Sequence, residues 1–361
     1  MFVYAILFIY ISFISSLKIA SRQKVLLIVI AIYIVMAFKA VTVGVDTKNY
    51  LYQYLNAYSP ENRTGFEPAF HYILYFCRTI VEMPPRIFWM LSYALIIFPL
   101  VWLTRLFVSN AFLTFIMYIT IGAFAFNMSG LRQSICVAFV EIATILYLFS
   151  NMKKKYSIVL MVAILFLCIN IHNTSKVCFI LLLLPLLREM NKKIFILSLF
   201  IPIACLLVSS SIPTLLEPMF EEMKYASYES FYTNYSSNIF FVFGVPYAVF
   251  AYTSYLYYRG IKLGRVDAKN TRVMYLYILS CISVCMSCLG LDFLIISRLI
   301  YYFSFYNYLL IPLLLYKYHV FRRETMYLQT IFIVLLCMAY FFIVTPGDVL
   351  KIDNYSFSID L

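Results

Sequence analysis

Long apolar runs alternate with short polar breaks along the whole chain. Most runs approach the roughly 20 residues that an α-helix needs to cross a bilayer. Twelve runs are therefore candidate spans, near 2–17, 25–40, 87–104, 111–126, 131–149, 156–171, 174–187, 194–210, 239–258, 273–291, 299–316 and 326–345. This pattern predicts an all-α polytopic membrane protein with one integral membrane domain, 1–361.

One further apolar run, 66–83, is predicted to lie flat at the membrane surface. If it crossed the bilayer, the basic cluster 153–155 would fall on the opposite side from the basic residues of 18–24. A flat, interfacial helix keeps both clusters on one side, as the distribution of positive charge requires. The first run, 2–17, lacks a basic start and a cleavage site, so we expect a retained span rather than a cleaved signal.

Composition supports the membrane assignment and excludes several functions. The 361 residues are 64% hydrophobic and 12% charged, and their mean hydropathy is +0.90. A soluble domain has about 25% charged residues. The sequence has no P-loop, no G-x-G-x-x-G motif and no paired Cys–His cluster, so we expect no bound cofactor or metal. Cys281, Cys285 and Cys288 share a helical face, which indicates small core residues rather than ligands.

Basic residues concentrate in the breaks on one side of the predicted topology. That side carries 18 of the 28 basic residues, namely Lys18, Arg22, Lys24, Arg105, Lys153, Lys154, Lys155, Arg188, Lys192, Lys193, Arg259, Lys262, Arg265, Lys269, Arg272, Lys317, Arg322 and Arg323. By the positive-inside rule this side is cytoplasmic. The net charge of +12 thus indicates topological anchors, and nucleic acid is not an expected partner. The long loops 41–86 and 211–238 then face the periplasm or exterior.

Polar and ionisable residues gather at the outer ends of these spans. The candidate site residues are Asp46, Tyr50, Glu67, Asn127, Arg132, Gln133, Glu141, His172, Lys176 and Arg298. An arginine at a helix start opposes the helix dipole, and together with the free N–H groups there it suits an anion. Positions four apart share a helix face, so we expect Glu67 to point with His71 and His172 with Lys176.

Each candidate also has a structural alternative. An arginine at a span end can be a snorkelling anchor, the acid Glu141 can make an interhelical hydrogen bond, His172 can belong to the core, and Asp46 can serve a turn. The combination of acids, histidine and arginines favours chemistry, because it suits activation of a hydroxyl with neutralisation of a departing phosphate.

Five segments of the chain resemble the EpsG family of bacterial membrane proteins. In order they are GVDTKNYLYQY, FEPAFHYILYF, MSGLRQSICVAF, IHNTSKVCFILLLL and SRLIYYFSFYNYLLIPL. G-x-D-x-x-x-Y, F-E-P-x-F and L-R-Q are the more specific motifs. The likeness runs from about Val41 to Leu315, and it implies a Wzy-type polymerase of O-antigen, capsule or exopolysaccharide. It also implies an architecture similar to GT-C glycosyltransferases, in which an acid follows an early span and a flat helix precedes the next.

The resemblance implies a reaction at the outer leaflet of the bacterial inner membrane. A growing chain is transferred from undecaprenyl pyrophosphate to a second lipid-linked oligosaccharide, without a metal, and a chain-length regulator is an expected partner. On this analogy Arg132, Arg298 and Lys176 bind the diphosphate. Asp46, Glu67 or His172 accepts the proton, and Tyr50, Asn127, Gln133 and Glu141 line the substrate site.

Two other classes of function remain open at the level of sequence. A flippase or exporter of lipid-linked sugars would place charges at several depths along a path. A membrane acyltransferase that decorates polysaccharide would place histidine and arginine near the cytoplasmic side, where His319 is the single histidine.

Overall fold

The computed structural model describes residues 2–59, 66–107, 110–149, 152–211, 244–290, 298–344, 352 and 355–359, and over these ranges the protein is helical, without a strand. One isolated antiparallel bridge joins Lys39 to Phe357. The residues form two compact units, Met1–Leu183 with Gln329–Leu361, and Leu184–Leu328. The loop 211–238 lies almost entirely outside the described residues.

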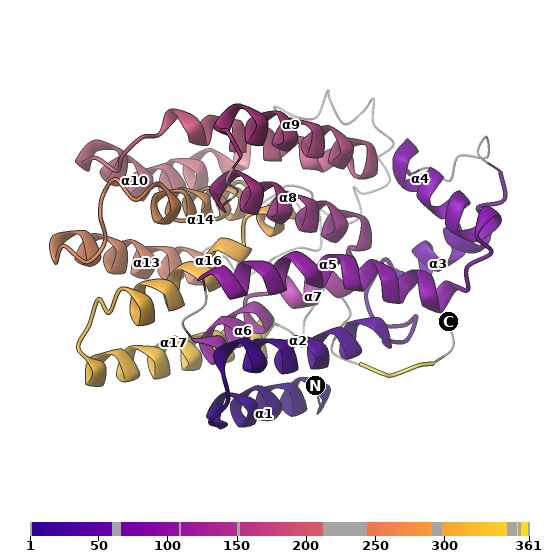
Figure 1. Cartoon of the computed structure of the whole chain (residues 1–361), viewed down its shortest axis with the longest axis horizontal. Helices are drawn as coiled ribbons and strands as arrows, with labels where there is room; N and C mark the ends of the chain where they lie inside the picture. The colour runs from indigo at the N-terminus through magenta and orange to yellow at the C-terminus, as the bar shows by residue number, and fades with distance from the viewer. Residues whose placement is uncertain are drawn as a thin grey trace. The chain divides into compact units, whose positions relative to one another are not determined.

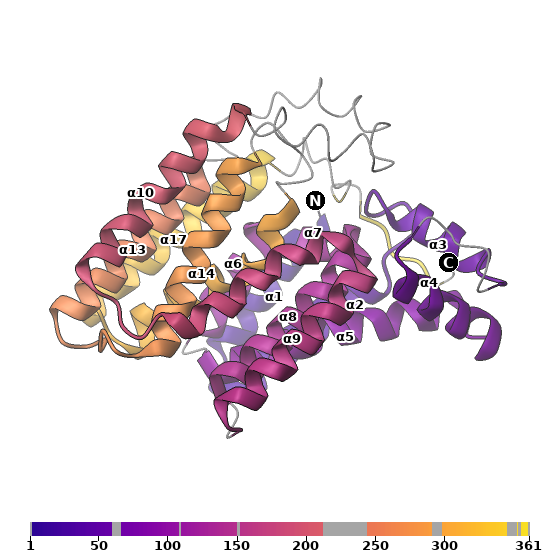
Figure 2. The same cartoon turned by 90° about the horizontal axis from the view of Figure 1, so that it is seen from above.

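Unit 1 contains most of the helices. They are α1 Phe2–Ser16, α2 Ser21–Ala37, α3 Thr47–Leu55, α4 Pro68–Tyr75 with its π-helical continuation η1 Phe76–Ile80, α5 Pro85–Phe107, α6 Ala111–Thr120, α7 Ala123–Ser129, α8 Leu131–Phe149, α9 Lys154–Ile171, the 3₁₀-helix η2 Asn173–Leu186, and α17 Arg323–Val344. Successive packing contacts order five of them as α9, α8, α5, α2 and α1 (Figure 1). Helices α3 and α4 lie together at one end of this unit (Figure 2).

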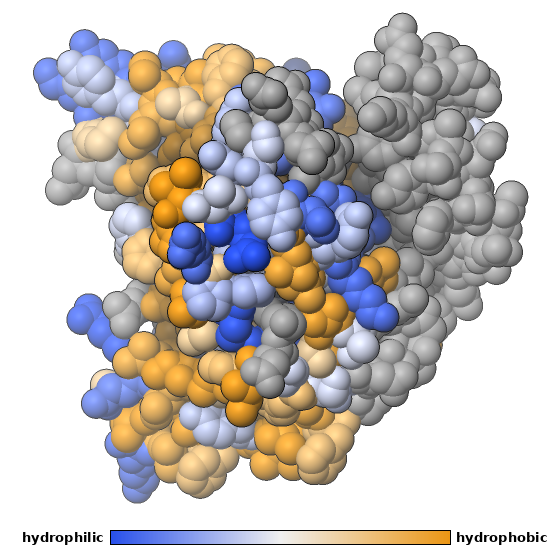
Figure 3. All heavy atoms as spheres, turned by 90° about the vertical axis from the view of Figure 1, so that its right-hand side faces the viewer, coloured by the Kyte–Doolittle hydropathy of each residue, from blue (hydrophilic) through white to orange (hydrophobic). Residues whose placement is uncertain are grey.

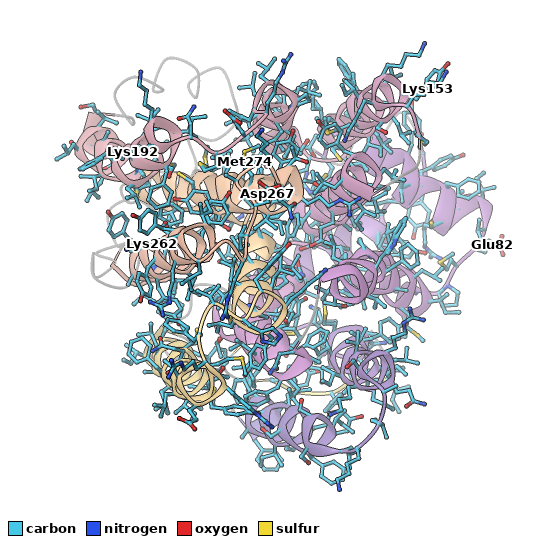
Figure 4. All side chains as sticks on the ribbon, turned by 60° about the vertical axis from the view of Figure 1, so that its left-hand side comes forward. Glu82, Lys153, Lys192, Lys262, Asp267 and Met274 are labelled. Carbon is cyan, nitrogen blue, oxygen red and sulfur yellow. The ribbon has the colours of Figure 1, made fainter. Side chains whose placement is uncertain are left out.

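Unit 2 is built around α14. Its elements are α10 Lys192–Val208, η3 Ser209–Ser211, α13 Val245–Lys262, α14 Thr271–Leu289, η6 Arg298–Tyr302, α16 Phe305–Pro312 and the π-helical η7 Leu313–Lys317. Helix α14 packs against α10, α13, α16 and η6. The N–H of Met190 donates to the carbonyl of Ala268 at 3.0 Å, and Lys192, Lys262 and Asp267 gather at this end of the unit (Figure 4). The breaks at 188–193 and 259–272 therefore lie together, as the charge pattern predicts.

The membrane character of the protein is visible in its helices. Within the described residues six helices are long and apolar enough to cross a bilayer, or seven if the bent pair α6–α7 forms one span. The count of twelve stays a prediction. The helices at 2–17 and 25–40 have 15 and 17 residues, the run 174–187 is a 3₁₀-helix, and the run 299–316 is divided among η6, α16 and η7.

A bend between α6 and α7 sets up the start of α8. The two helices differ in direction by 53°, and Gly122 at the junction has a φ of +92°, which favours glycine. Helix α7 ends at Gly130, where an added Cβ would lie 2.8 Å from the ring of Phe126. Helix α8 begins directly after this glycine, and Arg132 is its second residue. The short, closely packed α7 thus fixes where α8 begins, and with it the position of Arg132.

Candidate active site at Glu67

The carboxylate of Glu67 is the centre of the candidate site. Glu67 precedes α4 with an extended backbone, and Pro68 begins the helix, a position that proline favours. The carboxylate does not cap its own helix. Its Oε2 instead accepts a hydrogen bond from Nη1 of Arg132. Its Oε1 accepts one from the N–H of Asn173 at 2.8 Å and lies 3.2 Å from Nδ1 of His172.

Three separate elements meet at this carboxylate. Arg132 comes from the first turn of α8, while His172 ends α9 and Asn173 begins η2. Helices α8 and α9 pack against each other, and the contacts of Glu67 with both Arg132 and His172 place the start of α8 near the end of α9. The side chains of Glu67, Arg132 and His172 are 17%, 18% and 15% exposed. They are therefore partly shielded from solvent yet still reachable by a ligand.

An aromatic cluster of Tyr50, Phe66 and Phe70 surrounds the guanidinium of Arg132. Its Cζ lies 4.1 Å from the ring centroid of Phe66 and 5.9 Å from those of Tyr50 and Phe70. The rings also pack on one another, with centroids of Phe66 and Phe70 5.5 Å apart. Cation–π contacts of this kind strengthen when the cation loses water. The cluster thus holds the guanidinium in a fixed plane over an apolar wall.

The local charges keep Glu67 ionised. Its partial burial would raise the pKa of the carboxyl, but the hydrogen bond with His172, the charge of Arg132 and the N–H of Asn173 outweigh it and lower the pKa to about 2. Burial raises the pKa of the Tyr50 hydroxyl, and nearby Arg132 opposes this effect. At neutral pH the site therefore contains a carboxylate fully engaged with Arg132, His172 and the N–H of Asn173.

The loop that carries Asp46 is anchored from both sides. The ammonium of buried Lys39 donates to the carbonyl of Val43 at 2.7 Å and to the hydroxyl of Thr47. The N–H of Val45 donates to Oγ of Ser129 at 3.1 Å. These bonds fix the turn from which Asp46 leads into α3.

Asp46 itself is half-buried, and its charge contributes to the raised pKa of Tyr50. It therefore lies in the same electrostatic neighbourhood as the aromatic cluster and Arg132.

A sequence model of the EpsG family matches residues 23–357 of the chain. The chain belongs to the EpsG family. Members of this family are Wzy-type polysaccharide polymerase-like proteins, which gives the protein a glycosyltransferase-like role at the membrane in polysaccharide biosynthesis. No curated protein and no solved structure matched the chain.

In this EpsG-family protein the structure brings three predicted residues into direct contact, namely Glu67, Arg132 and His172. The expected pairing of Glu67 with His71 is wrong, because Glu67 precedes the helix in an extended conformation. His71 is buried, and its Nε2 lies 3.1 Å from the carbonyl of Ser59. His172 and Lys176 do not share an α-helical face, since a 3₁₀-helix follows His172.

The other candidates occupy different environments. Asn127 is buried on α7, and its Nδ2 donates to the hydroxyl of Tyr118 at 2.9 Å. Gln133 and Glu141 are buried on α8, and Lys176 is exposed. Their contact with substrate stays a prediction.

Arg298 begins η6 in unit 2 and is half-buried; its role beside Arg132 also stays a prediction.

The sequence reasoning missed the apolar wall and the loop anchor. Phe66 and Phe70 flank Glu67 four residues apart in FEPAF, a spacing that could have indicated one aromatic face. Lys39 lies inside the predicted span 25–40, and its position there gives no sign that it anchors the loop. Over the described ranges, no three His, Cys, Asp or Glu side chains lie close enough to hold a metal ion. Reaction without a metal remains an expectation.

Proposed function

We propose that the protein joins lipid-linked oligosaccharide repeat units into a polysaccharide. The donor is an oligosaccharide on undecaprenyl pyrophosphate, and the acceptor is a second unit of the same kind. The reaction takes place at the outer leaflet of the bacterial inner membrane, on the side facing the periplasm or exterior. Membership of the EpsG family supports the class of reaction, while the substrates and the side of the membrane are part of the proposal.

One observation carries this proposal: a carboxylate is bound by a guanidinium and an imidazole at the ends of two apolar helices. Glycosyl transfer from a diphosphate needs a cation where negative charge develops and a base for the acceptor hydroxyl. Arg132 and Glu67 supply these two groups in direct contact. The guanidinium matches the two-oxygen geometry of a phosphate.

In the proposed reaction the acceptor oxygen forms a bond to the anomeric carbon of the donor sugar. The bond from that carbon to the diphosphate oxygen breaks, and its electron pair leaves with the diphosphate. Arg132 stabilises this charge, with Lys176 and Arg298 as further cations. The proton of the acceptor hydroxyl passes to Glu67, with Asp46 as the alternative base.

The lowered pKa of Glu67 gives this mechanism an order of events. With a pKa of about 2 the carboxylate is a weak base. When a diphosphate takes the hydrogen bonds of Arg132, Glu67 loses a major stabilising partner, and its pKa rises toward the usual value of a carboxylic acid. The base thus becomes effective only when the leaving group is bound. The contact with His172 then keeps the carboxylate of Glu67 in its orientation.

Gel profiles of surface polysaccharide from a deletion strain test the proposal. The strain is complemented with the wild type, Arg132→Ala, Glu67→Gln, or the exposed control Glu82→Gln. We expect single repeat units with the deletion and both site variants, and full-length chains with the wild type and control. Loss of all surface sugar would instead indicate a flippase. Full-length chains that lack acyl groups would indicate an acyltransferase. Either result would overturn the proposal.

A further inference from the structure

Arg78 is a cation for which the described residues offer no hydrogen-bond acceptor. It lies in η1, the π-helical end of the helix that begins at Pro68. Its Nε is buried without a hydrogen-bond partner, and no residue in the described ranges accepts a hydrogen bond from its guanidinium. Arginine stays charged at all accessible pH values and carries five N–H donors. A buried N–H donor without an acceptor is costly unless a ligand supplies one.

The surroundings of Arg78 hold the guanidinium in place without neutralising it. Its Cζ lies 5.7 Å from the ring centroid of Tyr58, a cation–π contact. Thr79 donates to the carbonyl of Ala57 at 2.8 Å, which fixes the adjoining loop on η1. Glu82, one turn further along, is exposed and forms no ion pair with Arg78. Among the residues that the structure describes, no acid pairs with this charge, which leaves it available to an external anion.

The helix that carries Arg78 presents an apolar face outward. Tyr72, Phe76 and Ile80 are spaced four residues apart, and they are 52%, 55% and 59% exposed. In a membrane protein such a face contacts lipid. Figure 3 shows the end of the molecule on which α3 and α4 lie, with hydrophilic residues near its centre among hydrophobic ones. A guanidinium beside a lipid-facing surface suits the phosphate of a lipid.

We infer that Arg78 binds the diphosphate of a lipid-linked oligosaccharide, specifically that of the acceptor. This inference rests on the proposed function, in which two lipid diphosphates must bind at once. Helix α4 lies between Glu67 and Arg78, and its eight residues span about 12 Å at 1.5 Å per residue. We therefore assign the two cations, Arg132 and Arg78, to separate diphosphates. The donor diphosphate binds at Arg132 and the acceptor diphosphate at Arg78.

Lipid binding to the full-length protein in phosphatidylcholine nanodiscs tests the inference. Undecaprenyl pyrophosphate is titrated in one arm and phosphatidylglycerol in the other, with bound lipid counted by native mass spectrometry. The variants are Arg78→Gln and Arg78→Lys, and the control is the exposed arginine variant Arg22→Gln. We expect two undecaprenyl pyrophosphate molecules per wild-type chain, and a loss of affinity of about tenfold at one of them in Arg78→Gln.

The controls separate the alternatives. Arg78→Lys keeps the charge and the fold but loses the planar fork, so we expect an intermediate affinity. An unchanged titration of undecaprenyl pyrophosphate in Arg78→Gln would overturn the inference. A loss confined to phosphatidylglycerol would assign Arg78 to a phospholipid instead, and it would overturn the inference as well.

The binding assay involves no sugar transfer, so the two proposals fail separately. Wild-type binding through Arg78, with no change in polymer on deletion of the protein, would refute only the proposed function. Normal binding by Arg78→Gln, with polymer that depends on Arg132, would refute only the assignment of Arg78.

Discussion

Replacing Glu67 by glutamine removes one negative charge from a site that contains two potential cations. The pKa of this carboxyl is about 2, against the usual 4.5. Each tenfold change in acid dissociation corresponds to roughly 1.4 kcal/mol, so the folded surroundings favour the ionised form by about 3 kcal/mol. The side chain is 17% exposed, and solvent screening lowers this value. We therefore expect Glu67→Gln to destabilise the fold by about 2–3 kcal/mol at neutral pH.

The pH dependence of this loss follows from the direction of the pKa. A carboxyl whose pKa is lowered by folding stabilises the folded state above its unfolded pKa, and this contribution disappears as the pH falls through its folded pKa. The contribution of Glu67 is thus complete at pH 7 and declines between pH 4.5 and pH 2. At pH 3 less than half of it should remain.

Thermal unfolding of the purified protein in detergent measures the effect. Glu67→Gln should lower the Tm by roughly 3–4 °C at pH 7, and the difference from wild type should shrink at pH 3. The control Glu82→Gln, at an exposed position two residues after η1, should change the stability by less than about 0.5 kcal/mol at either pH. If the Tm difference between Glu67→Gln and wild type is the same at pH 7 and pH 3, the ionised carboxylate is not the source of the stability.

Three further predictions concern the groups around this carboxylate. Arg132→Lys keeps the charge but loses the planar fork over the aromatic cluster, so chain lengthening on polysaccharide gels should fall at least about tenfold at unchanged protein level. His172→Gln removes a hydrogen bond that lowers the pKa of Glu67; the acid limb of the pH–rate profile should therefore move to higher pH. Gly44→Ala places a Cβ 2.7 Å from a backbone carbonyl oxygen of α7, at a φ of +88°, and should cost about 2 kcal/mol in thermal unfolding. Gly264→Ala has a φ of +65° but no atom within 4 Å of the added Cβ, so it should cost less.

The sequence predicts which residues form the site better than it predicts which of them contact one another. Charge placement alone puts Arg132 and His172 at the same end of neighbouring spans, and their shared contact with Glu67 confirms this. Helical spacing pairs Glu67 with His71, which is wrong, because Pro68 begins the helix only after the acid. A four-residue periodicity applies only inside an α-helix. It cannot describe a residue just before one, or the 3₁₀-helix after His172.

The predicted membrane spans also agree with the structure only in part. Long apolar helices such as α5 and α10 match predicted spans closely, because a continuous apolar stretch of this length has few stable alternatives in a bilayer. The run 299–316 reads as one span by hydropathy, yet it divides into three helical pieces. Its serine, its asparagine and most of its tyrosines are buried in the protein, and hydropathy cannot distinguish residues that face protein from residues that face lipid.

The contact between Arg132 and Glu67 explains how a strongly charged site can exist among apolar helices before substrate arrives. Each group supplies the counter-charge of the other, and the aromatic cluster excludes water on one side. A half-buried guanidinium alone would be expensive, and so would a half-buried carboxylate. In the proposed reaction, a diphosphate that enters the site would replace Glu67 as the partner of Arg132, so the guanidinium would stay neutralised throughout. The displaced carboxylate would retain His172 and the N–H of Asn173, which would orient it while its basicity increases. In this proposal, binding of the leaving group and activation of the base are coupled through one ion pair. A lysine at position 132 would keep the charge balance but not the fixed plane that makes the exchange specific for a phosphate.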